Sequence, residues 1–192
     1  MSREHTDRID QPLAEYLEPA RFIDSDNPAV REFAGRVSDG AAGDLDAAVR
    51  TYYAVRDEIY YDPFLVGPDP GYFRASDCLR LRRGFCIPKA ALLAACARAL
   101  GIPARVGYAD VRNHLSTPRL TALVGGNEYT WHSYTDLYLE GRWVKATPAF
   151  NLALCERFGV QALEFDGGAD SLFQEFNRKG ERHMQYLRYR GT

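Results

Sequence analysis

Apolar residues recur every three or four positions in the first third of the chain, and this spacing predicts helices. Between residues 44 and 59 the positions with this spacing are Leu45, Val49, Tyr52, Tyr53, Arg56 and Ile59. A shorter helix is predicted to begin at Pro28, because Asp26 or Asn27 can cap it and proline suits the first turn. Three prolines and two glycines in residues 62–73 predict a loop.

The most apolar stretch of the sequence is "CIPKAALLAACARA", residues 86–99. Pro88 fits a first helical turn, where its missing N–H would be unpaired anyway. Gly101 and Pro103 end the helix. Only Lys89 and Arg98 are charged between these signals, so the helix is expected to be buried nearly all round.

After this helix the pattern changes to the alternation of strands. Residues 104–111, 129–141 and 142–150 are rich in β-branched and aromatic residues, and residues 184–190 form a closing strand. A two-residue turn at Glu140-Gly141 would place Leu139 opposite Arg142 and Tyr134 opposite Thr147. In that register Asp136 faces Lys145 and forms a cross-strand ion pair. Helices followed by mostly antiparallel strands predict an α+β fold.

Length and charge narrow the class of protein. The 192 residues suit a single domain, 1–192, with polar residues 1–20 loosely attached. A net charge of −2 gives no electrostatic reason to expect nucleic acid or an anionic membrane as partner. The longest apolar run, residues 90–97, is too short to span a bilayer, and the first residues lack the pattern of a signal peptide. We therefore expect a cytoplasmic protein.

The four cysteines do not have the spacing of a disulfide framework or a zinc site. Cys78, Cys96 and Cys155 are expected to be buried, reduced thiols. No metal or cofactor is expected.

Cys86 differs because it starts the apolar helix. A thiol there faces unpaired backbone N–H groups and the positive end of the helix dipole, which favour the thiolate. The amides of Cys86 and Ile87 can also hold an oxyanion, whereas Pro88 has no N–H to donate. Position alone leaves two interpretations open, a nucleophile or a small core residue.

A cysteine nucleophile needs a base, and His132 is the best candidate because a strand directs its ring. The alternative for His132 is a core histidine with satisfied hydrogen bonds. The other histidines, His5, His114 and His183, are expected at the surface.

Residues 75–150 resemble the transglutaminase-like core of the papain-like superfamily. The resemblance lies in the Gly-x-Cys start of a helix, "ALGIPAR" after it, and a Trp-His strand that leads into "GRWV". It implies a papain-like fold with a nucleophile at Cys86 and a catalytic imidazole at His132. Where the family usually has aspartate, this chain has Thr147, which can accept a hydrogen bond but carries no charge. Asn151 is the alternative third member, although it also suits the N-cap of a helix in residues 152–158.

The resemblance implies thiol-dependent acyl transfer or amide hydrolysis on a peptide or small amide substrate. Trp131 and Tyr134 flank the histidine and are candidates to line a groove for the acyl group. Residues 113–130 are a candidate flap. Arg80, Arg82 and Arg83 are either solvated charges or an anion site near the thiol. Two alternatives are a catalytically impaired binding module and an enzyme like the arylamine N-acetyltransferases, which "RRGFC" also resembles.

Overall fold

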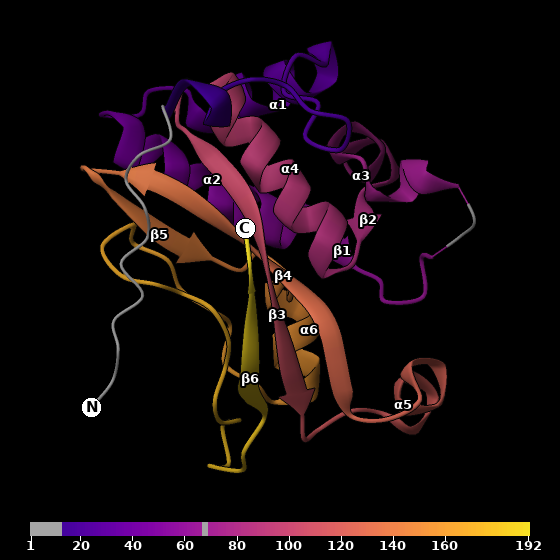
Figure 1. The fold of residues 1–192 in the computed structure, drawn as a ribbon. Helices are drawn as coiled ribbons and strands as arrows, with labels where there is room; N and C mark the ends of the chain where they lie inside the picture. Colours follow the sequence, from indigo (N-terminus) through magenta and orange to yellow (C-terminus); the bar gives the residue numbers. More distant parts are fainter. Residues whose placement is uncertain (1–12, 67–68) are drawn as a thin grey trace.

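The computed structural model of the chain describes residues 13–66 and 69–192. Its helices are η1 (Leu13–Tyr16), α1 (Pro28–Ser38), α2 (Asp44–Glu58), η2 (Pro70–Phe73), α3 (Ala75–Leu81), α4 (Cys86–Ala99), α5 (Pro118–Val124) and α6 (Leu152–Phe158). Its strands are β1 (Tyr60–Tyr61), β2 (Arg83–Gly84), β3 (Ala104–Asn113), β4 (Glu128–Leu139), β5 (Arg142–Ala146) and β6 (Met184–Gly191). Most helices precede the main strands, and the predicted α+β fold is confirmed (Figure 1).

An antiparallel sheet with the order β5-β4-β3-β6 forms one layer of the described structure. Helices α1, α2 and α3 gather around α4, which lies against this sheet (Figure 1). The hydroxyl of Thr135 on β4 donates to the carbonyl of Ala90 on α4 at 2.9 Å. Thr135 and the fully buried Leu137 therefore mark the face of β4 that receives α4.

Helix α4 is buried on all sides, as its composition predicts. Residues 88–97 are all buried, and Leu92 and Leu93 have no exposed surface. Each of these leucines contributes about 1.5–3 kcal/mol by leaving water. The helix ends at Ala99. Two residues later Gly101 has a left-handed φ of 81°, and the amide of Ile102 returns to the carbonyl of Ala97 at 2.9 Å.

The hairpin between β4 and β5 has the predicted register. Glu140 and Gly141 have φ values of 49° and 85°, as a type I′ turn requires, and Leu139 lies opposite Arg142. Asp136 pairs with Lys145 at 3.7 Å. The ladder ends one pair short of the predicted one, because the amide of Thr147 donates to the carbonyl of Ser171 instead, at 2.9 Å.

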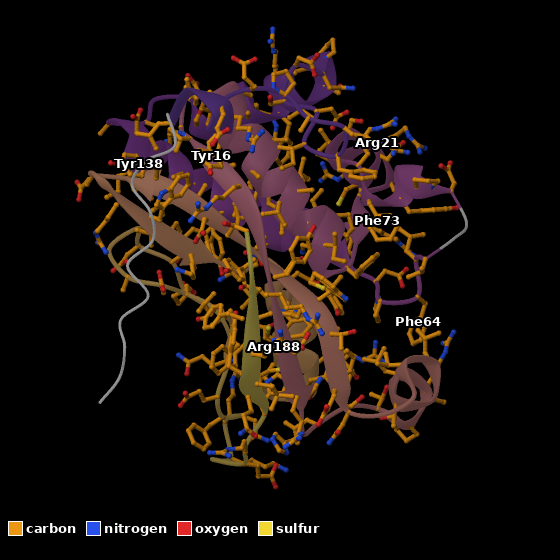
Figure 2. The ribbon with its side chains drawn as sticks, viewed as in Figure 1. Tyr16, Arg21, Phe64, Phe73, Tyr138 and Arg188 are labelled. Carbon is orange, nitrogen blue, oxygen red and sulfur yellow. The ribbon has the colours of Figure 1, made fainter. Side chains whose placement is uncertain are left out.

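Two segments are more ordered than their composition suggested. The candidate flap contains α5, which Thr117 caps through its hydroxyl, and Arg119 lies over the ring of Phe64 at 4.0 Å. Figure 2 shows Phe64 beside α5. Residues 13–20 contact the sheet through Tyr16, whose ring meets Trp143 edge-on at 5.1 Å, whereas residues 1–12 lie outside the described structure.

Lys89 is fully buried, and no pattern in the sequence indicates this. Its ammonium group donates to the carbonyls of Arg56 at 2.9 Å and Ile59 at 2.5 Å, at the C-terminal end of α2. Burial lowers the pKa of Lys89 to about 7, although the nearby Cys78 and Asp57 raise it. The lysine thus ties the end of α2 to the first turns of α4 at the cost of a buried cation.

This burial predicts how stability changes with pH. The unfolded chain holds the Lys89 proton up to a pKa of 10.5, whereas the folded chain releases it near 7, so unfolding takes up a proton between these values. We expect the free energy of unfolding of the wild type, relative to Lys89→Met, to rise through this window by at most about 1.4 kcal/mol per pH unit. Urea unfolding at several pH values measures this difference, with Lys179→Met at an exposed site as control. A difference that stays flat or falls with pH would contradict the buried cation.

Candidate active site

The start of α4 carries the thiol of Cys86 at its first residue, and Cys86 is partly exposed. The preceding residues form β2, which pairs in parallel with β1. Gly84 is required there, because a Cβ at this position would lie 2.8 Å from Sγ of Cys78 and 3.0 Å from Cγ of Pro88. This close approach gives the Gly-x-Cys motif a packing reason.

The surroundings of Cys86 favour its thiolate. Burial by itself raises the pKa of this thiol, but the His132 imidazole beside it and hydrogen bonds from Ser133 outweigh burial, so the pKa lies below the ordinary value. The structure therefore brings together Cys86 and His132, the two residues that the sequence singled out. The part played by Ser133 was not predicted.

The length of β5 explains how the thiol reaches β4. Strand β5 pairs with β4 only from Thr135 to Leu139, so the edge of β4 is not covered by β5 at Ser133. The backbone N–H of Ser133 donates there to Cys86. The Ser133 hydroxyl is buried and forms no regular hydrogen bond within the described residues, although it lies close enough to the thiol to help lower its pKa.

Neither candidate for the third catalytic residue contacts the His132 ring through a hydrogen bond. Thr147 is buried, and its hydroxyl has no hydrogen-bond partner in the described part of the chain. Asn151 stands at the N-cap position of α6, but its side-chain oxygen accepts from the amide of Tyr61 at 3.2 Å and does not cap the helix. Asp57 takes that role by accepting from the amide of Leu152 at 2.9 Å.

The two aromatic residues proposed to line an acyl groove separate in the structure. Trp131 is half exposed and lines a hollow beside α4. Tyr134 lines neither this hollow nor the one that contains His132, and its ring is buried over Gly107, where a Cβ would come within 2.3 Å of it. The Tyr134 ring thus covers this part of the sheet and leaves no space there for an acyl group.

Two hollows lie near Cys86, which is not itself one of their lining residues. One, of about 500 Å³, is lined by His132, Tyr61, Phe150, Leu154 and Phe158 among others. The other, of about 890 Å³, is lined by residues that include Ile87, Tyr108, Trp131, Phe22 and Phe73. Burial and then the charge of Cys86 raise the pKa values of both Tyr61 and Tyr108, so the thiol is near both rings. Most of the residues that line each hollow are apolar.

His183 corrects one expectation from the sequence. It is not a surface residue, since only 5% of it is exposed. Its ring stacks on Phe150 with 6.2 Å between centroids and contributes to the wall of the hollow that contains His132. Burial lowers the pKa of His183, and the nearby His114 adds to this. The apolar contact with Phe150, which no local pattern indicates, explains the difference.

The other cysteines and the arginines near the motif are structural. Cys78, Cys96 and Cys155 are free and buried, as predicted, and burial raises the pKa of Cys78 to about 12 and that of Cys155 to about 11. The arginines pair with surface carboxylates; the pairs are Arg80–Asp77, Arg82–Glu58 and Arg83–Asp62. Within the described residues, no three His, Cys, Asp or Glu side chains are grouped to hold a metal ion.

The arrangement can support attack by a thiolate on a carbonyl carbon. The amides of Cys86 and Ile87 belong to the first turn of α4, where helix geometry provides no carbonyl partner, and the N-cap Phe85 offers no side-chain bond. The place of Ser133 directly after His132 is the only sequence signal that it belongs to the site. Its hydrogen bond to the thiol depends on the tertiary structure, because β5 ends before it reaches Ser133.

Comparisons with known proteins identify the family of the chain. The profile of the Transglutaminase-like superfamily matches residues 31–148, whereas no curated protein matches the chain. Among solved structures, a candidate cysteine protease from Cytophaga hutchinsonii superposes with a TM-score of 0.57 at 16% identity, over 96% of this chain and 54% of its own. The chain therefore spans about half the length of that protein.

Two further structures are more distant. The periplasmic domain of TgpA from Pseudomonas aeruginosa has a TM-score of 0.48 at 23% identity, over 71% of this chain and 46% of its own. A candidate protease from Parabacteroides distasonis has a TM-score of 0.43 at 18% identity, over 70% of this chain and 25% of its own. No helix in the described residues is long and apolar enough to cross a membrane. The match over residues 31–148, together with the shared fold, shows that the chain belongs to the Transglutaminase-like superfamily.

Proposed function

We propose that the chain catalyses thiol-dependent acyl transfer or amide hydrolysis on a peptide or small amide substrate. One observation carries the proposal: the thiol that starts α4 lies beside His132 and the Ser133 amide, and its pKa is lowered despite burial. A thiol whose pKa is lowered although burial disfavours its ionisation is typical of a nucleophile.

The proposed reaction begins with attack by Sγ of Cys86 on the carbonyl carbon, and the π electrons move to the oxygen. The amides of Cys86 and Ile87 receive this oxyanion. His132, as imidazolium, gives its proton to the leaving amine while the C–N bond breaks, and a thioester remains on Cys86. Water or a second amine then attacks the thioester, His132 removes its proton, and the thiolate leaves.

The hollows suggest which side of the substrate lies where. The leaving or accepting amine has to reach the imidazole, and His132 lines the smaller hollow. The acyl group then occupies the larger hollow, which contains Ile87 and Trp131. Most residues that line the two hollows are apolar, which favours substrates with large apolar groups, and the larger hollow also has Arg21, Arg98 and Arg105 in its wall.

A catalytically impaired binding module is the second candidate. The observation in its favour is the hydroxyl of Thr147, which stands where the family usually has an acid and forms no bond with His132. An imidazolium without an acceptor for its second N–H is less stabilised in a buried site.

Alkylation of Cys86 tests the thiolate. We expect iodoacetamide to modify Cys86 rapidly at pH 6 in the wild type, and His132→Ala to slow this by about tenfold or more. Without the imidazole, burial raises the pKa of the Cys86 thiol and only Ser133 still lowers it. Peptide mapping of rates between pH 5 and 9 measures the effect, with buried Cys78 and Cys155 as internal controls. Reaction only near the ordinary thiol pKa, unchanged by the substitution, would favour the binding module.

An activated ester tests the chemistry itself. With p-nitrophenyl acetate we expect a burst of nitrophenol and one acetyl group on the peptide that contains Cys86. Cys86→Ala should abolish both signals, and His132→Ala should slow acetylation and the decay of the thioester. Fast alkylation without any acetylation would leave a reactive thiol but would rule out the proposed acyl transfer.

Thr147 gives a separate prediction. Because its buried hydroxyl has no hydrogen-bond partner among the described residues, Thr147→Val should leave the alkylation profile of Cys86 unchanged and stabilise the fold by up to about 1 kcal/mol. Rates at pH 6 and thermal unfolding measure the two effects. Loss of reactivity at pH 6 would instead assign Thr147 a role in orienting His132.

A further inference from the structure

We propose that Asp110 on β3 is a positioning residue for His132: its carboxylate, supported by Arg190, holds a β-bulge at Trp131 that sets the direction of the imidazole. The inference rests on the proposed function, because it concerns the same Cys86–His132 pair. It addresses the gap left by Thr147 and Asn151, neither of which bonds to the ring.

The bulge lies directly before His132. Ala109 pairs with His132 and Val111 pairs with Tyr129, so the single residue Asp110 faces residues 130–131 of β4. Trp131 has a φ of 61°, in the left-handed region that a bulky residue rarely adopts. Such a conformation persists only where the surroundings hold it, and it is common at functional sites.

Asp110 supplies a bond that holds this conformation. Its Oδ1 accepts from the backbone N–H of Trp131 at 3.3 Å and from Nε of Arg190 at 2.6 Å. The Arg190 guanidinium also lies over the Trp131 ring, 4.3 Å from its centroid, and Tyr108 meets the same ring edge-on at 5.7 Å. Backbone and ring of Trp131 are thus fixed by residues of β3 and β6.

The bulge controls the direction of the next two residues of β4. A change of the Trp131 backbone to an extended conformation would shift the register that directs the His132 side chain and the Ser133 amide. Both groups contact Cys86. With no side-chain acceptor from Thr147 or Asn151, the backbone of β4 is what orients the imidazole.

Asp110 remains charged during any assay near neutral pH. The hydrogen bond and charge of Arg190 lower its pKa, and the positive charge of Arg188 adds to this. A change in the pH profile of Cys86 therefore reports on the thiol and imidazole, and not on titration of Asp110.

The test is the alkylation of Cys86 against pH in Asp110→Ala and Asp110→Asn. We expect Asp110→Ala to lower the rate at pH 6 by about tenfold and to move the profile toward an ordinary thiol. Asparagine keeps an acceptor oxygen and should retain most of the wild-type rate at pH 6. Glu128→Gln is the matched control, because it breaks the pair of Glu128 with Arg112 across the same two strands without touching Trp131. A profile of Asp110→Ala that overlays the wild type, or asparagine as poor as alanine, would overturn the assignment.

A double-mutant cycle separates positioning from general loss of stability. Glycine adopts a left-handed φ without strain, so in a Trp131→Gly background the effect of Asp110→Ala should shrink to about threefold or less. An undiminished effect would show that Asp110 acts by another route. If Asp110→Ala does not fold, Arg190→Met replaces it, and an unchanged pH profile in that variant would overturn the proposal.

The result also distinguishes this inference from the proposed function. A wild type without fast alkylation at pH 6 refutes the activated thiol, whatever Asp110 does. A reactive wild type that is insensitive to Asp110 refutes only the positioning role.

Discussion

The packing of α4 against β4 is the constraint on which the site depends. The apolar side chains of residues 88–97 cover all sides of α4, so the helix can remove them from water only between the sheet and the other helices. The bond from Thr135 to the carbonyl of Ala90 fixes where it crosses β4. Its first residue then meets β4 near Ser133, beyond the end of β5. The packing of α4 thus holds its first residue, Cys86, beside β4.

The proposed chemistry relies on backbone groups more than on a chain of charged side chains. The thiol receives an N–H from Ser133 and faces the first turn of its own helix, while His132 supplies the neighbouring imidazole. Backbone donors need no side-chain ordering and carry fixed dipoles, so they lose little entropy on forming the site. Their direction depends on where strands begin, end and bulge. The short β5 and the left-handed Trp131 therefore matter as much as the identity of the residues.

Buried cations connect the helices behind the site. Lys89 donates to the carbonyls of Arg56 and Ile59, and the guanidinium of Arg56 binds the carbonyl of Leu163 at 2.7 Å. Each bond satisfies a carbonyl that would otherwise lose water without a partner. The lowered pKa of Lys89 shows that these hydrogen bonds do not fully offset the burial of its ammonium group. These contacts join α2, α4 and the segment after α6, which are far apart in sequence.

The sequence by itself predicted helices α1, α2, α4 and α6, the hairpin, and Cys86 and His132 as a candidate pair, but not helices α3 and α5. The composition of α4, the Glu140-Gly141 turn and the Gly-x-Cys motif are local signals, and local propensity and spacing are what a sequence records. Only the tertiary structure decided that Ser133 faces the thiol, that His183 is buried, and that the Thr147 hydroxyl has no hydrogen-bond partner within the described residues. Each depends on contacts between distant segments or on the residue at which a strand stops, and no periodicity encodes either. Physically, one residue more or less in a strand reverses which face a side chain occupies, so the site is set by register.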